Sequence, residues 1–375
     1  MKVLASRVLT RLEALEQRQL LRELRPPSGI DFSSNDYLGL AGHPLLKRSM
    51  MEAIEREGCG STGSRLLRGE REIFAAVERR FAAFKAAERA LFFSSGYLAN
   101  LSVLTVFPEP GDLILSDERN HASLIDAVRL SGVTCVVFPH NDVTALGSLL
   151  DESRRARRQT FVVTESLFSM DGDSPPLGDY ASLCRAAGAA LIVDEAHAVG
   201  IYGERGSGIL EASGVSHEQC ISVSTAGKAL GVGGAFVAGP AWAIAYLVQR
   251  ARPFIFSTAP PPAMAAALDA SLTIVADEPE RRTRLMHLVR VFRERLAEAG
   301  IAVSLGCSQI IPVIVGDNDR AVAIADTLQA QGFDIRAIRP PSVPPGTARF
   351  RISVNVNLTE PVIEDLVIAL AAALR

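Results

Sequence analysis

Residues 188–200, GAALIVDEAHAVG, give the clearest indication of the fold. An apolar run ends at Asp194 and is followed closely by His197 and a glycine. A short apolar run next to turn residues is typical of a strand that is buried on both faces, as in a parallel sheet. Ligands of open α/β sheets bind at the carboxyl ends of the strands, so we expect Asp194 and His197 to face a ligand site.

Six similar apolar runs accompany this strand and predict a seven-stranded sheet. They are ALFFS (90–94), DLILS (112–116), TCVVF (134–138), TFVVTE (160–165), CISVST (220–225) and AFVAG (235–239). The gaps between the first six strands are long enough for crossover helices, which favours a mainly parallel α/β sheet. Residues 226–234 are too few for such a crossover, so the last strand is expected to run antiparallel.

The segments outside this sheet predict a smaller α+β domain. An amphipathic helix is expected over residues 3–24, and long helices over 263–277 and 281–300. Strands are expected at IAVSL (301–305), IIPVIVG (310–316) and RFRISV (349–354), before a last helix at 361–374. We therefore expect an N-terminal helix and connecting segment (1–45), a large domain (46–262) and a small C-terminal domain (263–375).

Charge and cysteine content exclude several classes of protein. The formal net charge of the 375 residues is -3, so no overall basic field attracts nucleic acid. The five cysteines are scattered, with no CxxC pair for a metal site or a disulfide framework, which fits a reducing cytoplasm. The N-terminus has no signal-peptide pattern, and glycines and Pro240 break the uncharged stretch at 229–249, so no membrane span is expected.

Lys228 and a glycine-containing helix start suggest a cofactor. Lys228 directly follows a strand among small residues, where a partly desolvated amine can attack a carbonyl group and form a Schiff base. A solvated surface lysine is the simpler alternative. At 94–104, SSGYLANLSVL, a strand leads through Gly96 and Tyr97 into a helix whose free N–H groups can bind phosphate. With an aspartate for a pyridinium nitrogen, these features describe a pyridoxal phosphate (PLP) site.

Other polar residues occupy positions suited to a flat cofactor and an acidic substrate. His121 follows a strand and could stack on a ring, while Ser169 lies in a loop at the same sheet edge. Arg339 and Arg351 flank a proline-rich loop. A guanidinium group can bind a carboxylate through two hydrogen bonds. The alternatives are an ordinary surface histidine for His121, a simple turn for Ser169 and structural salt bridges for the two arginines.

The letters DEAH at 194–197 also occur in the Walker-B box of helicases, which makes an NTPase an alternative of a different class. An NTPase needs a phosphate-binding loop of the form GxxxxGK[ST]. The one candidate, TAGKA at 225–229, lacks the first glycine and has alanine in place of the magnesium-binding hydroxyl residue. The sequence therefore argues against this alternative.

The motifs together resemble the α-oxoamine synthases, PLP enzymes of the aspartate-aminotransferase fold (PLP fold type I). The resemblance extends from Asp31 to the C-terminus. It rests on DFSSNDYLGL (31–40), GSTGSRLLRG (60–69), SSGYLAN (94–100), NHASL (120–124), FSMDGD (168–173), VDEAHAVG (193–200), STAGKALG (224–231) and FSTAPPPA (256–263). It implies an α/β fold with a large PLP-binding domain and a smaller C-terminal α+β domain.

The resemblance also implies a role for each matching residue. Lys228 would hold the cofactor covalently and transfer protons, Asp194 would pair with the pyridinium nitrogen, His197 would bind the phenolic oxygen and His121 would stack on the ring. Further cofactor contacts would come from Gly96, Tyr97, Ser169, Thr225 and Thr258. Substrate contacts would come from Arg22, Asn35, His121, Arg339, Ser342 and Arg351.

Three segments indicate the substrates within this family. FSMDGDSPPL (168–177), VGDNDRA (315–321) and AIRPPSVPPGTARFR (337–351) most resemble the family members that are acyltransferases joining L-alanine to a pimeloyl thioester of coenzyme A or acyl carrier protein. Members that use glycine with acetyl or succinyl thioesters, or serine with palmitoyl thioester, are the alternatives, as is a binding protein without turnover. The resemblance further implies a homodimer with shared active sites, in which Ser257 or Thr258 reaches the neighbour's cofactor phosphate.

Overall fold

The computed structural model describes residues 1–303 and 306–375. Contacts between Cα atoms divide these residues into two compact units. The larger unit comprises residues 38–169 and 174–282, and the smaller unit comprises residues 1–37, 170–173 and 283–375. The domain boundaries expected from the sequence remain a prediction.

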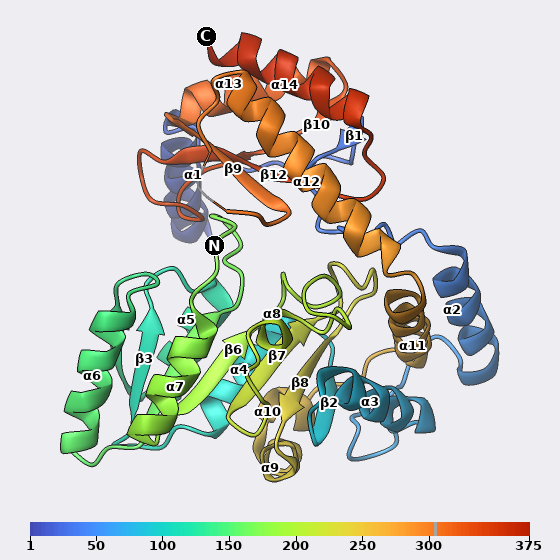
Figure 1. Cartoon of the computed structure of the whole chain (residues 1–375), viewed down its shortest axis with the longest axis vertical. Helices are drawn as coiled ribbons and strands as arrows, with labels where there is room; N and C mark the ends of the chain where they lie inside the picture. The colour runs from blue at the N-terminus through green and yellow to red at the C-terminus, as the bar shows by residue number, and fades with distance from the viewer. Residues whose placement is uncertain (304–305) are drawn as a thin grey trace. The chain divides into compact units, whose positions relative to one another are not determined.

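A seven-stranded sheet forms the centre of the larger unit (Figure 1). Its strands are β2 (Arg89–Phe93), β3 (Leu113–Asp117), β4 (Thr134–Phe138), β5 (Thr160–Glu165), β6 (Ala190–Asp194), β7 (Cys220–Thr225) and β8 (Ala235–Gly239). They lie in the order β2-β8-β7-β6-β5-β3-β4, and β8 is antiparallel to both of its neighbours while the other pairs are parallel. The predicted strands and the antiparallel direction of the last one are confirmed.

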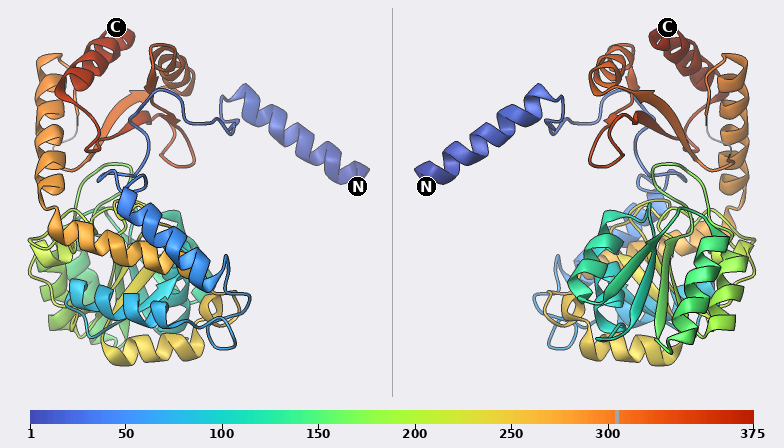
Figure 2. Two further views of the ribbon diagram at one scale, coloured as in Figure 1. Left: turned by 90° about the vertical axis from the view of Figure 1, so that its right-hand side faces the viewer. Right: turned by 90° about the vertical axis from the view of Figure 1, so that its left-hand side faces the viewer.

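Helices surround this sheet in the larger unit. They are α2 (Pro44–Glu57), α3 (Glu72–Lys85), α4 (Gly96–Val106), α5 (Ala122–Ser131), α6 (Val143–Arg155), α7 (Leu177–Ala187), α8 (Ile209–Ala212), α9 (Ala241–Arg250), α10 (Arg252–Ile255) and α11 (Pro262–Asp277). Apolar residues of α4 and α9, such as Val103 and Ile244, join Val237 of β8 in one buried cluster. Figure 2 shows α11 beside α2 and α3, with which it makes extensive contacts. Burial of these apolar faces fixes the strand ends in place.

The smaller unit contains an antiparallel sheet in the order β11-β12-β9, formed by β9 (Ile310–Gly316), β11 (Ala337–Ile338) and β12 (Ala348–Ser353). Helix α13 (Asn318–Ala330) packs on this sheet and on α14 (Glu360–Leu374), and α12 (Glu280–Glu298) precedes β9. A separate parallel pair joins β1 (Ile30–Asp31) to β10 (Phe333–Asp334).

Two sequence-based expectations differ from the smaller unit. Residues 301–303 of the predicted strand IAVSL are not in a strand, and its last two residues lie outside the described part of the chain. The N-terminal helix α1 (Lys2–Gln17) ends before residue 24, because the chain leaves the helical conformation at Gln19, which has a φ of 53°. None of the α1 residues is buried. Among the described residues, no helix is both long and apolar enough to span a bilayer.

Candidate active site

A cavity of about 190 Å³ lies at the carboxyl ends of β5, β6 and β7 in the larger unit. We call it the strand-end cavity. Its lining contains seven of the predicted site residues, Gly96, Tyr97, His121, Asp194, His197, Thr225 and Lys228. Four other residues, Asn100, Ser123, Glu165 and Ala196, complete the lining. The topology thus brings together residues from five separate segments of the chain.

Asp194 is held in one orientation at the end of β6. Its side chain is 6% exposed, and its two oxygens accept hydrogen bonds from Nδ2 of Asn100 at 2.7 Å and from the backbone N–H of Ala196 at 2.8 Å. Asn100 also donates to Ser123 Oγ at 2.9 Å. Asn100 lies one turn after the start of α4, and the sequence analysis assigned it no role although it stands in the SSGYLAN motif. Only the fold shows that it faces Asp194.

Lys228 and His197 meet across the strand-end cavity. Nζ of Lys228 lies 2.7 Å from Nε2 of His197, and His197 is itself buried. The turn that carries Lys228 requires glycine at its end, because Gly231 has a φ of +69° and a Cβ atom there would lie 2.6 Å from the backbone nitrogen of Ala41. A tight glycine turn therefore places the amine beside the imidazole ring.

The first turn of α4 forms another wall of the cavity. The side chain of Ser95 caps this helix by accepting a hydrogen bond from the N–H of Leu98 at 3.3 Å. A Cβ atom on Gly96 would lie 3.4 Å from Cβ of Thr225, so a larger residue would fill the space between α4 and β7. The start of a helix presents free N–H groups and a partial positive charge, which suit a phosphate.

His121 caps the start of α5 at the edge of the cavity. Its Nδ1 accepts a hydrogen bond from the N–H of Ser123 and lies 2.7 Å from the hydroxyl of the same residue. Desolvation lowers the pKa of His121, and the nearby Lys228 acts in the same direction while Asp194 opposes it. A neutral imidazole at this position is suited to stacking against a flat ring.

Two predicted cofactor residues do not line the strand-end cavity. Ser169 lies in the loop after β5, and its backbone N–H donates a hydrogen bond to the carboxyl group of Glu165. Thr258 is exposed in the loop before α11. The adjacent Ala259 donates a hydrogen bond to the carbonyl group of Gly63 at 2.9 Å.

Glu195, the second letter of DEAH, does not line the cavity. Its carboxyl group is fully buried and forms an ion pair with Nζ of the equally buried Lys85 of α3. Its other oxygen accepts the N–H of Leu210 at 2.9 Å. A helicase-type Walker-B glutamate would need to face a bound nucleotide, so this placement argues against the NTPase alternative.

Predicted substrate residues of the smaller unit form two groups. In the first group, Arg351 of β12 is 9% exposed and donates hydrogen bonds to Ser353 Oγ at 2.9 Å and to the Tyr37 hydroxyl at 3.0 Å. Tyr37 in turn donates to Asn35 Oδ1 at 2.9 Å. Burial raises the pKa of Tyr37, so its hydroxyl remains neutral and links the guanidinium group to the amide. The sequence analysis did not single out Tyr37.

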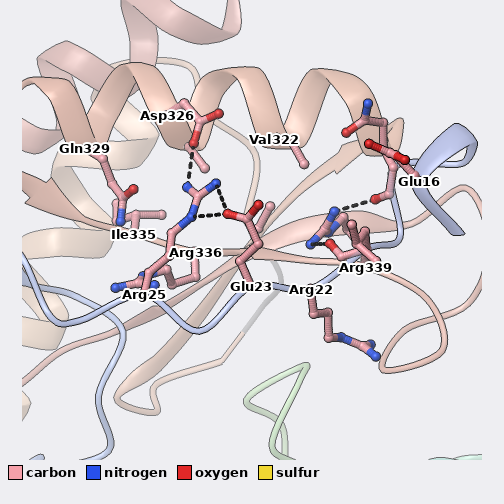
Figure 3. Close-up of a pocket in the computed structure, with 14 residues that line it drawn as sticks. Glu16, Arg22, Glu23, Arg25, Val322, Asp326, Gln329, Ile335, Arg336 and Arg339 are labelled. Carbon is pink, nitrogen blue, oxygen red and sulfur yellow. Dashed lines mark hydrogen bonds and ion pairs between the residues drawn. The ribbon is translucent and has the colours of Figure 1, made fainter. Parts of the chain in front are cut away.

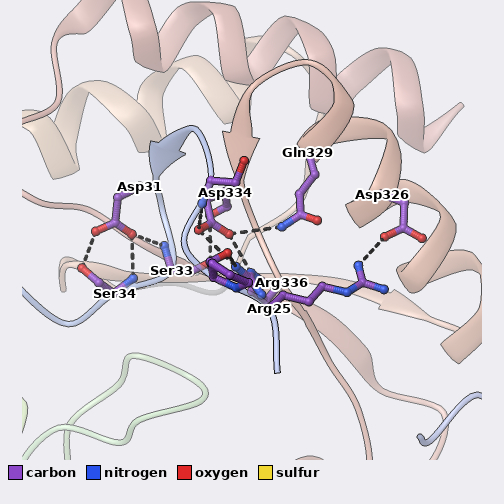
Figure 4. A network of polar contacts seen from close by, with 10 residues as sticks. Arg25, Asp31, Ser33, Ser34, Asp326, Gln329, Asp334 and Arg336 are labelled. Atoms are coloured by element: carbon purple, nitrogen blue, oxygen red, sulfur yellow. Dashed lines mark hydrogen bonds and ion pairs between the residues drawn. The ribbon is translucent and has the colours of Figure 1, made fainter. Parts of the chain in front are cut away.

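The second group lines a cavity of about 430 Å³ that contains four arginines (Figure 3). We call it the arginine cavity; its arginines are Arg22, Arg25, Arg336 and Arg339. Arg25 pairs with Glu23 at 3.1 Å. Arg25 also pairs with Asp326 at 3.1 Å, and Arg336 pairs with Asp334 at 2.6 Å (Figure 4). Arg25 and Arg336 are therefore both paired with acidic residues, and a further carboxylate, that of Glu16, also lines the cavity.

The other two arginines of the arginine cavity form no ion pair among the described residues. Arg339 donates to the backbone carbonyl groups of Gln19 and Leu21, and Arg22 has no hydrogen bond or ion pair within the described residues. Desolvation lowers the pKa of Arg339, and repulsion from Arg22 and Arg25 lowers it further. Ser342 is exposed in the following turn and does not line the cavity.

The donor set of the strand-end cavity fits PLP. The cavity contains an amine, a carboxylate supplied with two hydrogen-bond donors and a helix start for a phosphate. Two buried oxygens in its lining, Oδ1 of Asn100 and Oε1 of Glu165, have no hydrogen-bond partner among the described residues. Unpartnered buried polar atoms are costly in a finished core and are consistent with a polar group binding there.

Comparisons with known proteins agree with this interpretation. The profile of the family "Aminotransferase class I and II" matches residues 27–370. An 8-amino-7-oxononanoate synthase from Anaeromyxobacter dehalogenans is 44% identical over 97% of this chain and 94% of its own length. The crystal structure of an 8-amino-7-oxononanoate synthase from Francisella tularensis superimposes with a TM-score of 0.81 and 29% identity, covering 92% of this chain and 97% of the other. A serine palmitoyltransferase structure that contains PLP gives a TM-score of 0.91 at 27% identity, covering 98% of this chain and 96% of the other.

Proposed function

The chain belongs to the class I and II aminotransferase family, and on this basis we propose its reaction. It is a PLP-dependent acyltransferase that condenses L-alanine with a pimeloyl thioester. The products are 8-amino-7-oxononanoate, CO2 and the free thiol, and the reaction belongs to biotin biosynthesis. The support for this substrate pair is the 44% identity to a relative named for this product over almost its whole length.

One observation carries the chemical part of the proposal. Lys228, His197 and Asp194 converge on one cavity at the strand ends, beside the start of α4. In the proposed site Asp194 pairs with the ring nitrogen of PLP, Lys228 bonds to its aldehyde carbon and the first turn of α4 binds its phosphate with Thr225. His197 contacts the phenolic oxygen and His121 stacks on the ring.

The protein's residues then act on the substrate bound next to the cofactor. PLP supplies a ring that accepts an electron pair when a bond at the amino-acid Cα breaks. Once the amino group of alanine has taken its place on the cofactor, the freed Nζ of Lys228 would take the proton from Cα of alanine and later return a proton to the same carbon. Asp194 keeps the ring nitrogen protonated, because a buried carboxylate with a fixed orientation stabilises the adjacent positive charge.

The smaller unit supplies the proposed substrate contacts. Arg351 binds the carboxylate of alanine, with Tyr37 and Asn35 holding the guanidinium group in position. Arg22 and Arg339 bind the free carboxylate at the far end of the pimeloyl chain, with Ser342 close by in sequence. Neither guanidinium group forms an ion pair with a carboxylate among the described residues, which supports an anionic ligand in the arginine cavity.

We also propose a homodimer in the cytoplasm. Leu67 is 82% exposed and Phe256 is 71% exposed, so each offers a large apolar side chain that a partner could cover. They stand in two loops that are joined by the hydrogen bond from Ala259 to Gly63. A second copy of the chain that covers these loops would bring Ser257 and Thr258 to the neighbour's cofactor phosphate. All five cysteines are free, which suits a reducing compartment.

A thiol-release assay tests the proposed reaction. Pimeloyl, acetyl, succinyl and palmitoyl thioesters are each offered with alanine, glycine and serine, and the pimeloyl group is offered on both coenzyme A and acyl carrier protein. We expect the fastest release with L-alanine and a pimeloyl thioester, and a product with the mass of 8-amino-7-oxononanoate. Faster release with glycine and the acetyl thioester would instead assign the chain to the glycine C-acetyltransferase reaction.

A further inference from the structure

Glu165 is a second carboxyl residue in the strand-end cavity, next to Asp194. It is the last residue of β5, and the parallel pairing of β5 with β6 sets Glu165 opposite Asp194. Side chains of residues paired in this way project from the same face of the sheet, and adjacent strands are about 4.8 Å apart. Glu165 is 3% exposed. Two carboxyl groups are therefore buried side by side at one end of the sheet.

The surroundings of these two carboxyl groups differ. The two carboxylate oxygens of Asp194 accept hydrogen bonds from the side-chain amide of Asn100 and from the backbone N–H of Ala196. The carboxyl group of Glu165 accepts hydrogen bonds from the backbone N–H groups of His121 and Ser169. Its Oε1 atom is nevertheless buried without a hydrogen-bond partner among the described residues. Two adjacent buried carboxylates repel each other, so one of the pair remains protonated.

Glu165 is the protonated member of the pair. Burial raises the pKa of Glu165 to about 8, and the negative charge of Asp194 acts in the same direction. Lys228 and the two backbone N–H groups oppose this shift. The imidazole of His121, which faces the same cavity, is neutral and adds no charge. At neutral pH Glu165 therefore has a hydroxyl hydrogen to donate.

The order of the strands indicates which part of the cofactor Glu165 faces. On the PLP ring, the phosphate arm and the phenolic oxygen lie on opposite sides of the line from the nitrogen to the aldehyde carbon. Gly96 of α4 adjoins Thr225 of β7, so the phosphate lies on the β7 side of Asp194. Strand β5 lies on the other side of β6. The side of the ring that carries the phenolic oxygen then faces Glu165.

We propose that Glu165 donates a hydrogen bond from Oε1 to the phenolic oxygen of the bound cofactor. The proposal rests on the cofactor site described under the proposed function. The contact stabilises a negatively charged oxygen without placing a second negative charge beside it. Glu165 is thus a further cofactor-binding residue, which no motif in the sequence identified.

Two variants of the full-length holoenzyme test this contact by spectroscopy. Glu165→Gln keeps a neutral hydrogen-bond donor, whereas Glu165→Met removes it. The measured quantity is the pH midpoint at which the yellow band of the Lys228–cofactor chromophore fades. We expect no shift in Glu165→Gln and a rise of about one pH unit in Glu165→Met, because an unassisted phenolic oxygen holds the chromophore proton more tightly.

Infrared spectra of the same samples report the protonation state of Glu165 directly. At pH 7 the wild type should show the carbonyl stretch of a protonated carboxylic acid, and Glu165→Gln should lack it. Glu118→Gln, which alters an exposed carboxylate just beyond β3, serves as the control and should leave both signals unchanged. A fall of the midpoint in Glu165→Gln, unchanged midpoints in both variants, or an absent carboxylic acid band would each overturn the proposal.

The wild type gives the answer if the variants do not fold. When PLP is replaced by its analogue without the phenolic oxygen, the carboxylic acid band should move to higher frequency because its hydrogen bond is lost. A band that stays in place overturns the contact. Failure of the underlying cofactor site would look different, because the wild type would then show neither the yellow chromophore nor a covalent bond at Lys228.

Discussion

The strand-end cavity and the arginine cavity are constructed in different ways. In the strand-end cavity, Asp194 and His197 are buried at the end of a central strand, and neighbouring side chains fix their positions. In the arginine cavity, Arg22 is exposed on a segment without regular structure and has no polar partner within the described residues. The first is rigid before any ligand binds, whereas the second has side chains that can adjust to a ligand.

This difference separates chemistry from substrate recognition. Electrostatic catalysis needs groups that are already oriented when charge develops, and buried partners provide that orientation. Recognition of a flexible acyl chain needs only a site of complementary charge that can adapt. We therefore expect changes in the strand-end cavity to reduce turnover and changes in the arginine cavity to reduce apparent affinity.

Asp194→Asn is expected to have the largest effect. An amide cannot stabilise a protonated ring nitrogen, so the protein should keep its colour and lose about three orders of magnitude in turnover, as for other buried electrostatic groups. The measurement is the exchange of the Cα proton of alanine with solvent. Near-normal exchange would contradict the role of Asp194 and would remove the main functional difference between the two cavities.

Lys85→Met tests how far the buried ion pair with Glu195, the residue after Asp194, stabilises the larger unit that holds the strand-end cavity. Loss of Lys85 leaves the carboxylate of Glu195 buried without its partner, and we expect the free energy of unfolding to fall by about 3 kcal/mol. Chemical denaturation measures this change. The double variant Lys85→Met with Glu195→Leu is the control and should recover most of the loss, because it leaves no unpaired charge. Equal losses in the single and double variants would show that packing, rather than charge, is responsible.

Arg351→Lys examines a buried residue that belongs to the smaller unit. Lysine keeps the charge but cannot make the planar two-point contact with a carboxylate, so alanine binding should weaken by about 2 kcal/mol. Titration of the cofactor spectrum with alanine gives the affinity, and the melting temperature gives the stability. A lower melting temperature with unchanged alanine affinity would indicate a structural arginine.

Arg22→Ala is expected to have the smallest effect of the four. The exposed guanidinium group contributes about 1 kcal/mol to binding an anion, so the KM for the pimeloyl thioester should rise about fivefold while kcat stays the same. Arg7→Ala, in the exposed helix α1, is the matched control and should change neither constant. A lower kcat in Arg22→Ala would mean that the arginine cavity is as closely coupled to the chemistry as the strand-end cavity.

The sequence predicted the strand-end cavity well because its residues stand at the ends of apolar strands. Strand position follows from local hydrophobic pattern and gap length, which placed Asp194, His197 and Lys228 at one edge. Asn100 and Glu165 were missed because their importance depends on the side chains opposite them. Sequence spacing alone does not determine those contacts.

The smaller unit was less predictable because its contacts connect distant parts of the chain. The pairing of β1 with β10 joins residues about 300 positions apart, and neither strand is longer than two residues. Such short strands have no periodic pattern of their own. The link from Arg351 through Tyr37 to Asn35 depends on the same long-range arrangement. The position where α1 ends also depends on the conformation of a single residue, Gln19.

Borohydride reduction of the purified holoenzyme, followed by peptide mapping, tests whether Lys228 holds the cofactor. The chain has only four lysines, Lys2, Lys47, Lys85 and Lys228, so each can be assigned to its own peptide. We predict that reduction bleaches the yellow band and leaves the cofactor attached to Lys228 alone, and that Lys228→Ala folds without any covalent label. A label on another lysine would rule out Lys228 as the cofactor lysine, and a protein that takes up no PLP would rule out the strand-end cavity as a PLP site.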